Sequence, residues 1–97
     1  MINLKLTDVD EFINTNGKSI IAFINPKTIL SASTLRILKE IENNKVKIGW
    51  VDVEEDKAVF NKFTLRIIPT IHVYNNGDLV VKLTLPFSKK DLECLIN

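Results

Sequence analysis

The chain has 97 residues, which is enough for one core and too few for two, because a chain of this length buries only about 60–70% of its unfolded surface. Hydrophobic residues make up 45% and charged residues 26%, as in an ordinary soluble globule, so we expect a single domain over residues 1–97. Thirteen Lys and Arg against twelve Asp and Glu leave a formal net charge of +1, and this lacks the long-range field that gathers nucleic acid or anionic membrane.

The first half of the chain alternates between strand and helix patterns. "INLKL" alternates like a strand, and Thr7 with Asp10 resembles a capping box that opens a short helix over "DVDEFINT", closed near Gly17. The run "SIIAFI" is continuously β-branched and aromatic, which is typical of a strand buried on both faces. Leu and Ile at threefold spacing then predict a helix that runs to about Asn44.

The second half continues the alternation and ends in a hairpin and a helix. "VKIGWVDV" predicts a strand, and a short helix follows it before "IIPT". "TIHVY" and "LVVKLTL" flank Asn76-Gly77, a pair that accepts the positive φ angles of a tight hairpin turn. Ser88 with Asp91 forms a second capping-box pattern and predicts a final helix.

The predicted order is therefore strand, helix, strand, helix, strand, helix, strand, strand, helix. Strands that alternate with helices form a parallel portion covered on both faces, and the hairpin adds an antiparallel edge. The expected fold class is α/β, with a mixed five-stranded sheet flanked by helices on both faces.

The N-terminus and the cysteine content bear on the compartment. "MINLKLTDVDEF" has no basic segment followed by an apolar stretch, and nothing approaches the eighteen or so consecutive apolar residues of a membrane span. The single cysteine, Cys94, cannot close an internal disulfide, which agrees with a reducing compartment. We expect a cytoplasmic protein.

The element order, with "IIPT" before the hairpin and "NNGDLV" inside it, resembles the thioredoxin family, and from Ala22 onward the match has no gap. Phe23 falls on the Phe that ends the family's central strand. Arg66 and Ile68-Pro69-Thr70 fall on its cis-proline segment, and Asn76-Gly77 on its hairpin turn. The resemblance implies a thioredoxin fold and a cis bond after Ile68.

In that register, the family's redox motif of two cysteines separated by two residues falls on Thr28-Ile29-Leu30-Ser31. A thioredoxin works because a thiolate at a helix N-terminus attacks a disulfide and is released by a second thiol on the next turn. Neither Thr28 nor Ser31 ionises near neutral pH or forms a disulfide. We therefore expect no catalytic residue here and no thiol–disulfide chemistry at these positions.

The supporting residues of that chemistry are also replaced. Thioredoxins commonly hold a buried Asp under the motif, with a Lys on the neighbouring strand, and those positions are Ala22 and Trp50 here. A small and a large apolar residue of compensating volume make an acceptable core, because charges are costly to keep dry. Losses that extend to the proton path favour a natural, redox-silent relative over an engineered cysteine variant.

The family binds its substrate as an extended peptide against the cis-proline loop, through backbone contacts that do not need the thiols. Aliphatic side chains now stand where the family tends to have Gly-Pro and further glycines. An alternative is that these side chains, Ile29, Leu30, Ile67 and Leu85, turn into the core, which is less expected of Ile29 and Ile67 because the fold places both at the surface. Otherwise the expected partner-binding residues are Ile29, Leu30, Ile67, Ile68, Pro69 and Leu85.

The leading functional hypothesis is a redox-inactive binding module for a protein, an extended peptide or a second copy of the chain. It implies no cofactor, no metal, no nucleic acid and no membrane. The alternative is a thiol–disulfide oxidoreductase relative in cell redox homeostasis, with residual single-thiol chemistry at Cys94. Because Cys94 has no neighbouring cationic activator in the sequence, a packing role on its helix is favoured.

Three further groups of residues could have a catalytic or binding role, but for each of them we favour a structural role. His72 is a strand histidine among apolar neighbours, so a satisfied structural role is favoured over general-base catalysis. The carboxylates of residues 52–56 are expected to stabilise a helix N-terminus. Ser31 and Ser33 could cradle a small anion in a first helical turn, but ordinary capping uses the same hydroxyls.

Overall fold

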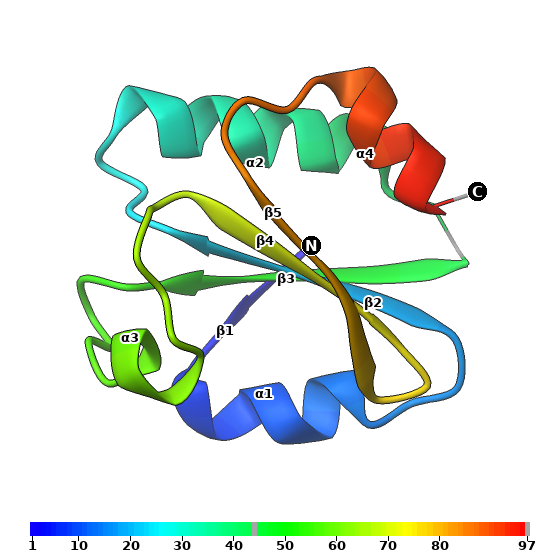
Figure 1. The fold of residues 1–97 in the computed structure, drawn as a ribbon, viewed down its shortest axis with the longest axis horizontal. Helices are drawn as coiled ribbons and strands as arrows, with labels where there is room; N and C mark the ends of the chain where they lie inside the picture. The colour runs from blue at the N-terminus through cyan, green and yellow to red at the C-terminus, as the bar shows by residue number, and fades with distance from the viewer. Residues whose placement is uncertain (44, 97) are drawn as a thin grey trace.

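The computed structural model describes residues 1–43 and 45–96, with side chains through Leu95. Four helices and five strands alternate in the predicted order within this part of the chain (Figure 1). The strands are β1 (Ile2–Leu4), β2 (Lys18–Ile24), β3 (Val46–Asp52), β4 (Thr70–Asn75) and β5 (Asp78–Thr84). The helices are α1 (Leu6–Ile13), α2 (Ile29–Ile41), α3 (Val59–Lys62) and α4 (Lys89–Ile96).

The strands form one mixed sheet in the order β1-β3-β2-β4-β5. β3 pairs parallel with both β1 and β2, whereas β4 runs antiparallel to β2 and β5. The central strand β2 is buried from Ser19 to Ile24, because helices cover both faces of the sheet and exclude solvent from the side chains of this strand. The expected mixed sheet of five strands is thus confirmed.

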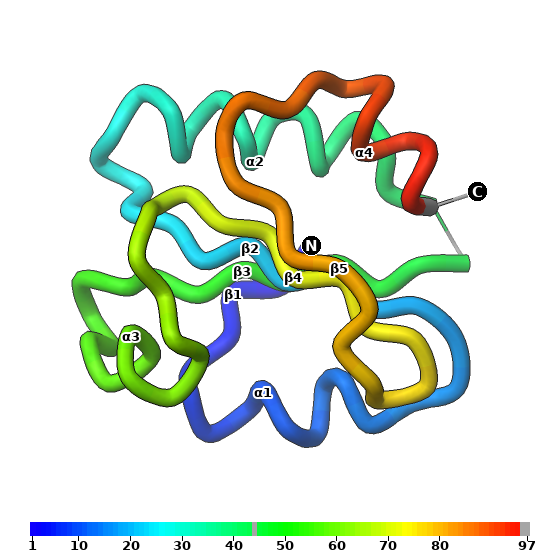
Figure 2. The backbone as a smooth tube through the Cα atoms, viewed as in Figure 1, coloured from blue at the N-terminus to red at the C-terminus, as the bar shows by residue number. Residues whose placement is uncertain are grey.

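The helices lie in two layers, with α2 and α4 on one face of the sheet and α1 and α3 on the other (Figure 2). Each face has its own hydrophobic cluster. Ile20, Ala22 and Leu38 belong to the cluster under α2 and α4. Phe23 and Val59 belong to the cluster under α1 and α3. None of the helices in the described residues is long and apolar enough to span a membrane.

The start of α1 differs from the predicted capping box. The helix begins at Leu6, and the Asp8 carboxylate accepts a hydrogen bond of 3.0 Å from the Lys5 N–H. The Leu6 N–H donates to Asp56 over 2.7 Å, although Asp56 is far along the chain. The prediction from Thr7 was therefore wrong by two residues, because a distant carboxylate satisfies the first helical N–H group.

The hairpin turn agrees with its prediction. Asn76 has φ 53° and Gly77 has φ 88°, the left-handed angles that a tight primed turn requires. The Asn76 side chain also accepts a hydrogen bond of 2.7 Å from the Gly17 N–H, which ties the turn to the end of the α1–β2 connection.

The start of α4 agrees with its prediction, whereas the end of α2 differs from its prediction. The Ser88–Asp91 capping box at the start of α4 is present, with the Ser88 N–H 2.8 Å from the Asp91 carboxylate and the Asp91 N–H 3.2 Å from the Ser88 hydroxyl. α2 ends at Ile41, before the predicted limit at Asn44, and Asn44 lies outside the described residues.

Candidate functional site

Sheet register brings the predicted site segments to one end of the sheet. Phe23 near the end of β2 pairs with Thr70 at the start of β4, and Thr70 pairs with Thr84 at the end of β5. The β2–α2 connection, the loop before β4 and the segment after β5 must therefore leave the sheet at the same end (Figure 1). Their predicted proximity follows from strand pairing.

The hydroxyls at the degenerate motif positions are used to build the start of α2. Thr28 is the N-cap, and its side-chain oxygen accepts from the Ser31 N–H at 3.4 Å and donates to the Asn25 carbonyl at 2.9 Å. Ser31 is fully buried, and its hydroxyl accepts from the Asn25 N–H at 3.1 Å. The capping role expected of Ser31 belongs to Thr28 instead, and the Ser31 oxygen is already occupied by backbone.

Beneath the motif, the expected apolar pair is in place. Ala22 on β2 is fully buried and pairs in register with Trp50 on β3. Trp50 is half-buried and packs against the cluster under α2 and α4. Neither position carries an ionisable side chain, and hydrocarbon and an indole ring fill this part of the interior.

The aliphatic residues of the predicted binding face divide into two groups. Ile29 is 84% exposed, and Leu30 and Ile67 are each 55% exposed. Leu85 is half-buried, and Ile68 is half-buried against the cluster under α1 and α3. The alternative that the aliphatic replacements turn into the core therefore applies in part to Leu85, but not to Ile29, Leu30 and Ile67.

The proline loop presents backbone beside these side chains. The Ile68–Pro69 peptide bond is cis, in agreement with the geometry that the resemblance implies, and Pro69 is buried. The Thr70 hydroxyl donates to the Ile67 carbonyl, which closes the loop onto β4. Among the described residues, the Ile68 N–H and carbonyl make no backbone hydrogen bond. These two groups can pair with an added strand.

His72 is not the satisfied structural residue that we expected. It is 1% exposed and its ring stacks edge-on against Phe23, with centroids 4.8 Å apart. Nδ1 lies 3.3 Å from the Tyr74 hydroxyl, but Nε2 is buried without a hydrogen-bond partner in the part of the chain that the structure describes. Burial and, to a smaller extent, the Lys82 charge lower the pKa of His72 to about 4.

This low pKa makes stability depend on pH. The unfolded histidine takes up a proton as the pH falls through 6.5, whereas the folded protein takes it up only near pH 4, so folding loses free energy across that interval. Between pH 7.5 and 5 we expect the free energy of unfolding to fall by about 2 kcal/mol from this residue. Urea denaturation at both pH values measures the loss.

A matched variant isolates the histidine from other titrating groups. His72→Gln keeps a polar side chain but cannot titrate, so about 2 kcal/mol of the loss between pH 7.5 and 5 should disappear. Lys82 and Arg66 are the other charged residues that line the same cavity, and both proteins in the comparison keep them. An identical pH dependence in wild type and variant would contradict the buried, neutral state of His72.

Two of the carboxylates in residues 52–56 accept hydrogen bonds from backbone N–H groups, but not from those at the start of α3. Asp52 accepts a 2.9 Å hydrogen bond from the Glu54 N–H inside its own turn, and Asp56 caps α1 rather than α3. Glu55 pairs with Lys5 at 2.5 Å, where both side chains are exposed. No group of three or more His, Cys, Asp or Glu in residues 1–43 and 45–96 could hold a metal ion.

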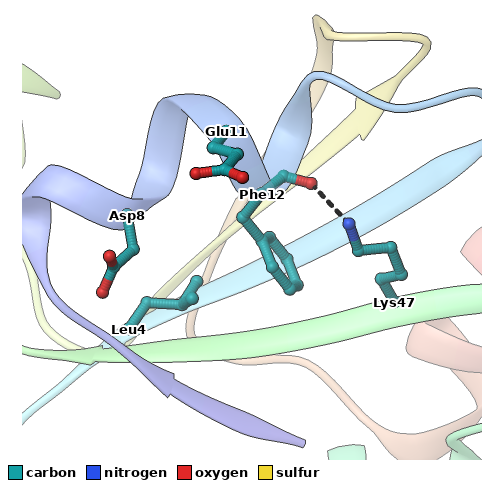
Figure 3. Close-up of a pocket in the computed structure, with 5 residues that line it drawn as sticks. All are labelled: Leu4, Asp8, Glu11, Phe12 and Lys47. Atoms are coloured by element: carbon teal, nitrogen blue, oxygen red, sulfur yellow. Dashed lines mark hydrogen bonds between the residues drawn. The ribbon is translucent and has the colours of Figure 1, made fainter.

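A hollow of about 290 Å³ lies beside α1, and two of the charged side chains that line it, Lys47 and Asp8, are engaged with backbone groups. Figure 3 shows the Lys47 ammonium pointing at the Phe12 carbonyl, to which it donates over 3.0 Å, and it also lies 4.5 Å from the Phe12 ring centroid. Asp8 on the same wall accepts from the Lys5 backbone. A Cβ at the neighbouring Gly49 would lie 2.5 Å from Leu4 Cδ1, so a larger residue there would force the Leu4 side chain to shift. These contacts hold α1 on the sheet.

Cys94 lies on α4 and is exposed. The expectation that it packs on the flank of its helix is therefore wrong. α4 is the last helix of the chain, whereas the degenerate motif begins α2, so the thiol is not one of the residues that strand register gathers at the site.

The comparisons with known proteins agree with this geometry. A family model described as Thioredoxin matches residues 10–97. The chain belongs to the thioredoxin family. Over 97 aligned positions it is 28% identical to a thioredoxin from Buchnera aphidicola subsp. Acyrthosiphon pisum (strain APS), which covers 93% of this chain and 89% of that protein.

Two solved thioredoxin structures share the fold. A mutant thioredoxin from Halobacterium salinarum NRC-1 superposes with a TM-score of 0.88 at 18% identity, covering 98% of this chain and 86% of that one. Malassezia sympodialis thioredoxin (Mala s 13), described as a member of a pan-allergen family, superposes with a TM-score of 0.84 at 16% identity. The match covers 99% of this chain and 87% of that one. This member of the thioredoxin family nevertheless has one cysteine, so an intramolecular cysteine pair is absent.

Proposed function

We propose that this chain is a redox-inactive thioredoxin-like domain of the cytoplasm that binds an extended protein segment at the end of its sheet. The site is the groove face, defined as Ile29, Leu30 and Ile67 with the backbone of Ile68-Pro69 and the half-buried Leu85. The observation that carries the proposal is that exposed aliphatic side chains occur together with Ile68 backbone groups that make no backbone hydrogen bond among the described residues. None of the residues in this face carries a thiol.

The energies favour a combined contact over a purely apolar one. Burying the three exposed side chains of the groove face contributes roughly 5–9 kcal/mol before costs, at about 1.5–3 kcal/mol each. Association costs an estimated 4–15 kcal/mol, so apolar contact alone supports weak binding. Strand-like pairing with Ile68 adds the hydrogen bonds that an extended segment brings and that a globular surface lacks.

The test substitutes the most exposed member of the groove face. Ile29→Asp removes apolar surface, and Asp in the first turn of α2 complements the helix dipole, so the fold should keep its stability. We expect capture of partner proteins from native lysate, and any self-association seen by sedimentation, to weaken roughly 10- to 100-fold. Ile67→Asp should have a similar effect from the other side of the groove.

Val80 supplies the matched control. Its side chain is 54% exposed, a fraction similar to the 55% of Leu30 and of Ile67. Val80 lies on β5, however, and not in the segments that make up the groove face. Val80→Asp should retain every partner that wild type retains. Equal retention by wild type, Ile29→Asp and Ile67→Asp would refute the groove face as the binding surface.

A second candidate function is residual thiol chemistry. It is supported by the exposed Cys94 and by the curated relative whose name is Thioredoxin. A single thiol forms a mixed disulfide with a partner but has no second thiol to release it, so turnover would need an external reductant. Insulin reduction by wild type and by Cys94→Ser separates this candidate from the binding module.

A further inference from the structure

A cavity of about 210 Å³ opens between the start of β4, the end of β5 and the loop that leaves α3. Its walls are residues 64–67 of the loop, Thr70 and His72 of β4, and Lys82 and Thr84 of β5. It shares Ile67 with the groove face but otherwise uses residues to which the proposed function gives no role.

The buried His72 is one of the residues that line this cavity. Nδ1 of His72 is turned towards Tyr74, which does not line the cavity, so Nε2 lies on the side of the ring away from Tyr74. The stacked rings of Phe23 and Phe63, with centroids 4.8 and 6.1 Å from that of His72, hold this orientation. Within the described residues Nε2 has no partner, and a buried ring nitrogen without one is costly.

The polar groups around the cavity are suited to an anion. Tyr74 is a neutral phenol near pH 7, because burial raises its pKa to about 12. When its hydroxyl donates to Nδ1 of the neutral His72, Nε2 carries the proton and becomes a donor. Lys82 faces His72 across the β4–β5 ladder, and Arg66 adds a second cation. No carboxylate is among the residues that line the cavity.

The remaining walls are apolar and the volume is small. Leu65 and Ile67 present hydrocarbon, and the Thr70 hydroxyl is turned to the Ile67 carbonyl. A cavity of about 210 Å³ is below the range of drug-sized pockets, so it holds only a few heavy atoms. Apolar walls around one convergent set of donors fit a branched hydrocarbon that ends in an anionic group better than a bare inorganic ion.

We propose that this cavity binds a small carboxylate with a short apolar body, its oxygens against His72 Nε2 and the Lys82 ammonium and its hydrocarbon against Leu65 and Ile67. The carboxylate comes either from a free short-chain acid or from the C-terminus of a peptide that ends beside Ile67. Both sources present the same chemistry to the same donors.

Because the chain has one histidine, its imidazole nitrogens report on the site without ambiguity. Wild-type protein labelled with ¹⁵N is titrated at pH 7 and constant ionic strength with isobutyrate, and separately with a peptide that ends in a free valine carboxylate. We expect a saturable shift of His72 Nε2, with backbone shifts confined to residues 64–67 and 82–84. Saturation by isobutyrate assigns a free acid, and saturation by the peptide alone assigns a C-terminus.

Ligand controls test the chemistry. Isobutyramide and the peptide's C-terminal amide have the same shape without the charge, and phosphate has charge without the apolar body, so each should shift Nε2 at least tenfold less at equal concentration. Equal responses to the amides would show a merely apolar hollow, and an equal response to phosphate would show simple attraction to the two cations. Either result, or a linear response to both carboxylates, overturns the proposal.

Protein variants keep the test independent of folding and of the groove face. His72→Gln and Lys82→Gln should each weaken binding at least tenfold, followed through the backbone shifts, and Lys82 is exposed enough to be replaced without unfolding. Lys90→Gln removes the same charge from α4 and should change nothing. Ile29→Asp should weaken partner capture roughly 10- to 100-fold yet leave the isobutyrate titration intact, so failure of one proposal is distinguishable from failure of the other.

Discussion

The purified protein is expected to reduce insulin disulfides no faster than dithiothreitol alone, whereas the double variant Thr28→Cys/Ser31→Cys should do so about tenfold faster or more. A thiol at the helix N-terminus has a lowered pKa and attacks a disulfide, and the second thiol on the next turn releases the mixed intermediate. The measurement is the turbidity of precipitating insulin B chain under matched reductant.

The geometry at the start of α2 supports the gain in the double variant. Thr28 is exposed and Ser31 is fully buried, which suits an attacking thiol that meets substrate and a resolving thiol that does not. The Thr28 oxygen is 3.4 Å from the Ser31 N–H, so the new thiolate would replace an existing hydrogen-bond acceptor at the N-cap. Because Ala22 supplies no proton acceptor beneath the motif, we expect the double variant to remain slower than an ordinary thioredoxin.

Single-thiol variants separate the two candidate functions. Thr28→Cys alone should trap mixed disulfides without turnover, because no second motif thiol resolves them. Cys94→Ser should leave the wild-type rate unchanged. Turnover by wild type that disappears in Cys94→Ser would establish the oxidoreductase candidate and refute the redox-inactive module.

Ala22→Asp is expected to lower the free energy of unfolding by roughly 3–5 kcal/mol, because it buries a carboxylate that no cation compensates. Ala22 is fully buried and its neighbour in register is Trp50, which offers no positive charge. Urea denaturation at pH 7 measures the loss. The loss should shrink in acid, where the carboxylate binds a proton and becomes neutral.

Ala32→Asp is the matched control for this substitution. It makes the same chemical change at an exposed position in the first turn of α2, where negative charge is tolerated, so stability should change by less than about 0.5 kcal/mol. If Ala22→Asp were equally harmless, the interior beneath the motif would have to admit water or a counter-ion. That result would contradict the loss of a proton path at this site.

Local patterns in the sequence were sufficient for most of the fold. The Asn76-Gly77 turn and the Ser88–Asp91 box depend on neighbouring residues alone, and both are present. The buried run in β2 was recognisable because five consecutive apolar residues, 20–24, match a strand that is covered by helices on both faces. The start of α1 was missed because its first N–H binds Asp56, a partner that no local pattern reveals.

The sequence indicated which aliphatic residues stand near the start of α2 and the proline loop, but not which of them are exposed. Replacement of both motif sulfurs can be read from Thr28 and Ser31 directly. Ile29 is exposed to solvent, whereas Ile68 packs against the cluster under α1 and α3. This difference depends on loop geometry, which cannot be inferred from a run of aliphatic residues in the sequence.

The sequence by itself determined the order of elements, the hairpin turn and the absence of a cysteine pair, since each depends on residue type and local spacing. Tertiary structure alone decided the surroundings of His72. A regular hairpin in the register of Tyr74 and Leu79 would place Val81 beside it, but the irregularity between Val73 and Tyr74 shifts the pairing to Lys82. One residue of slip turns every later side chain to the other face of the sheet, so that single shift brings a cation to the buried imidazole.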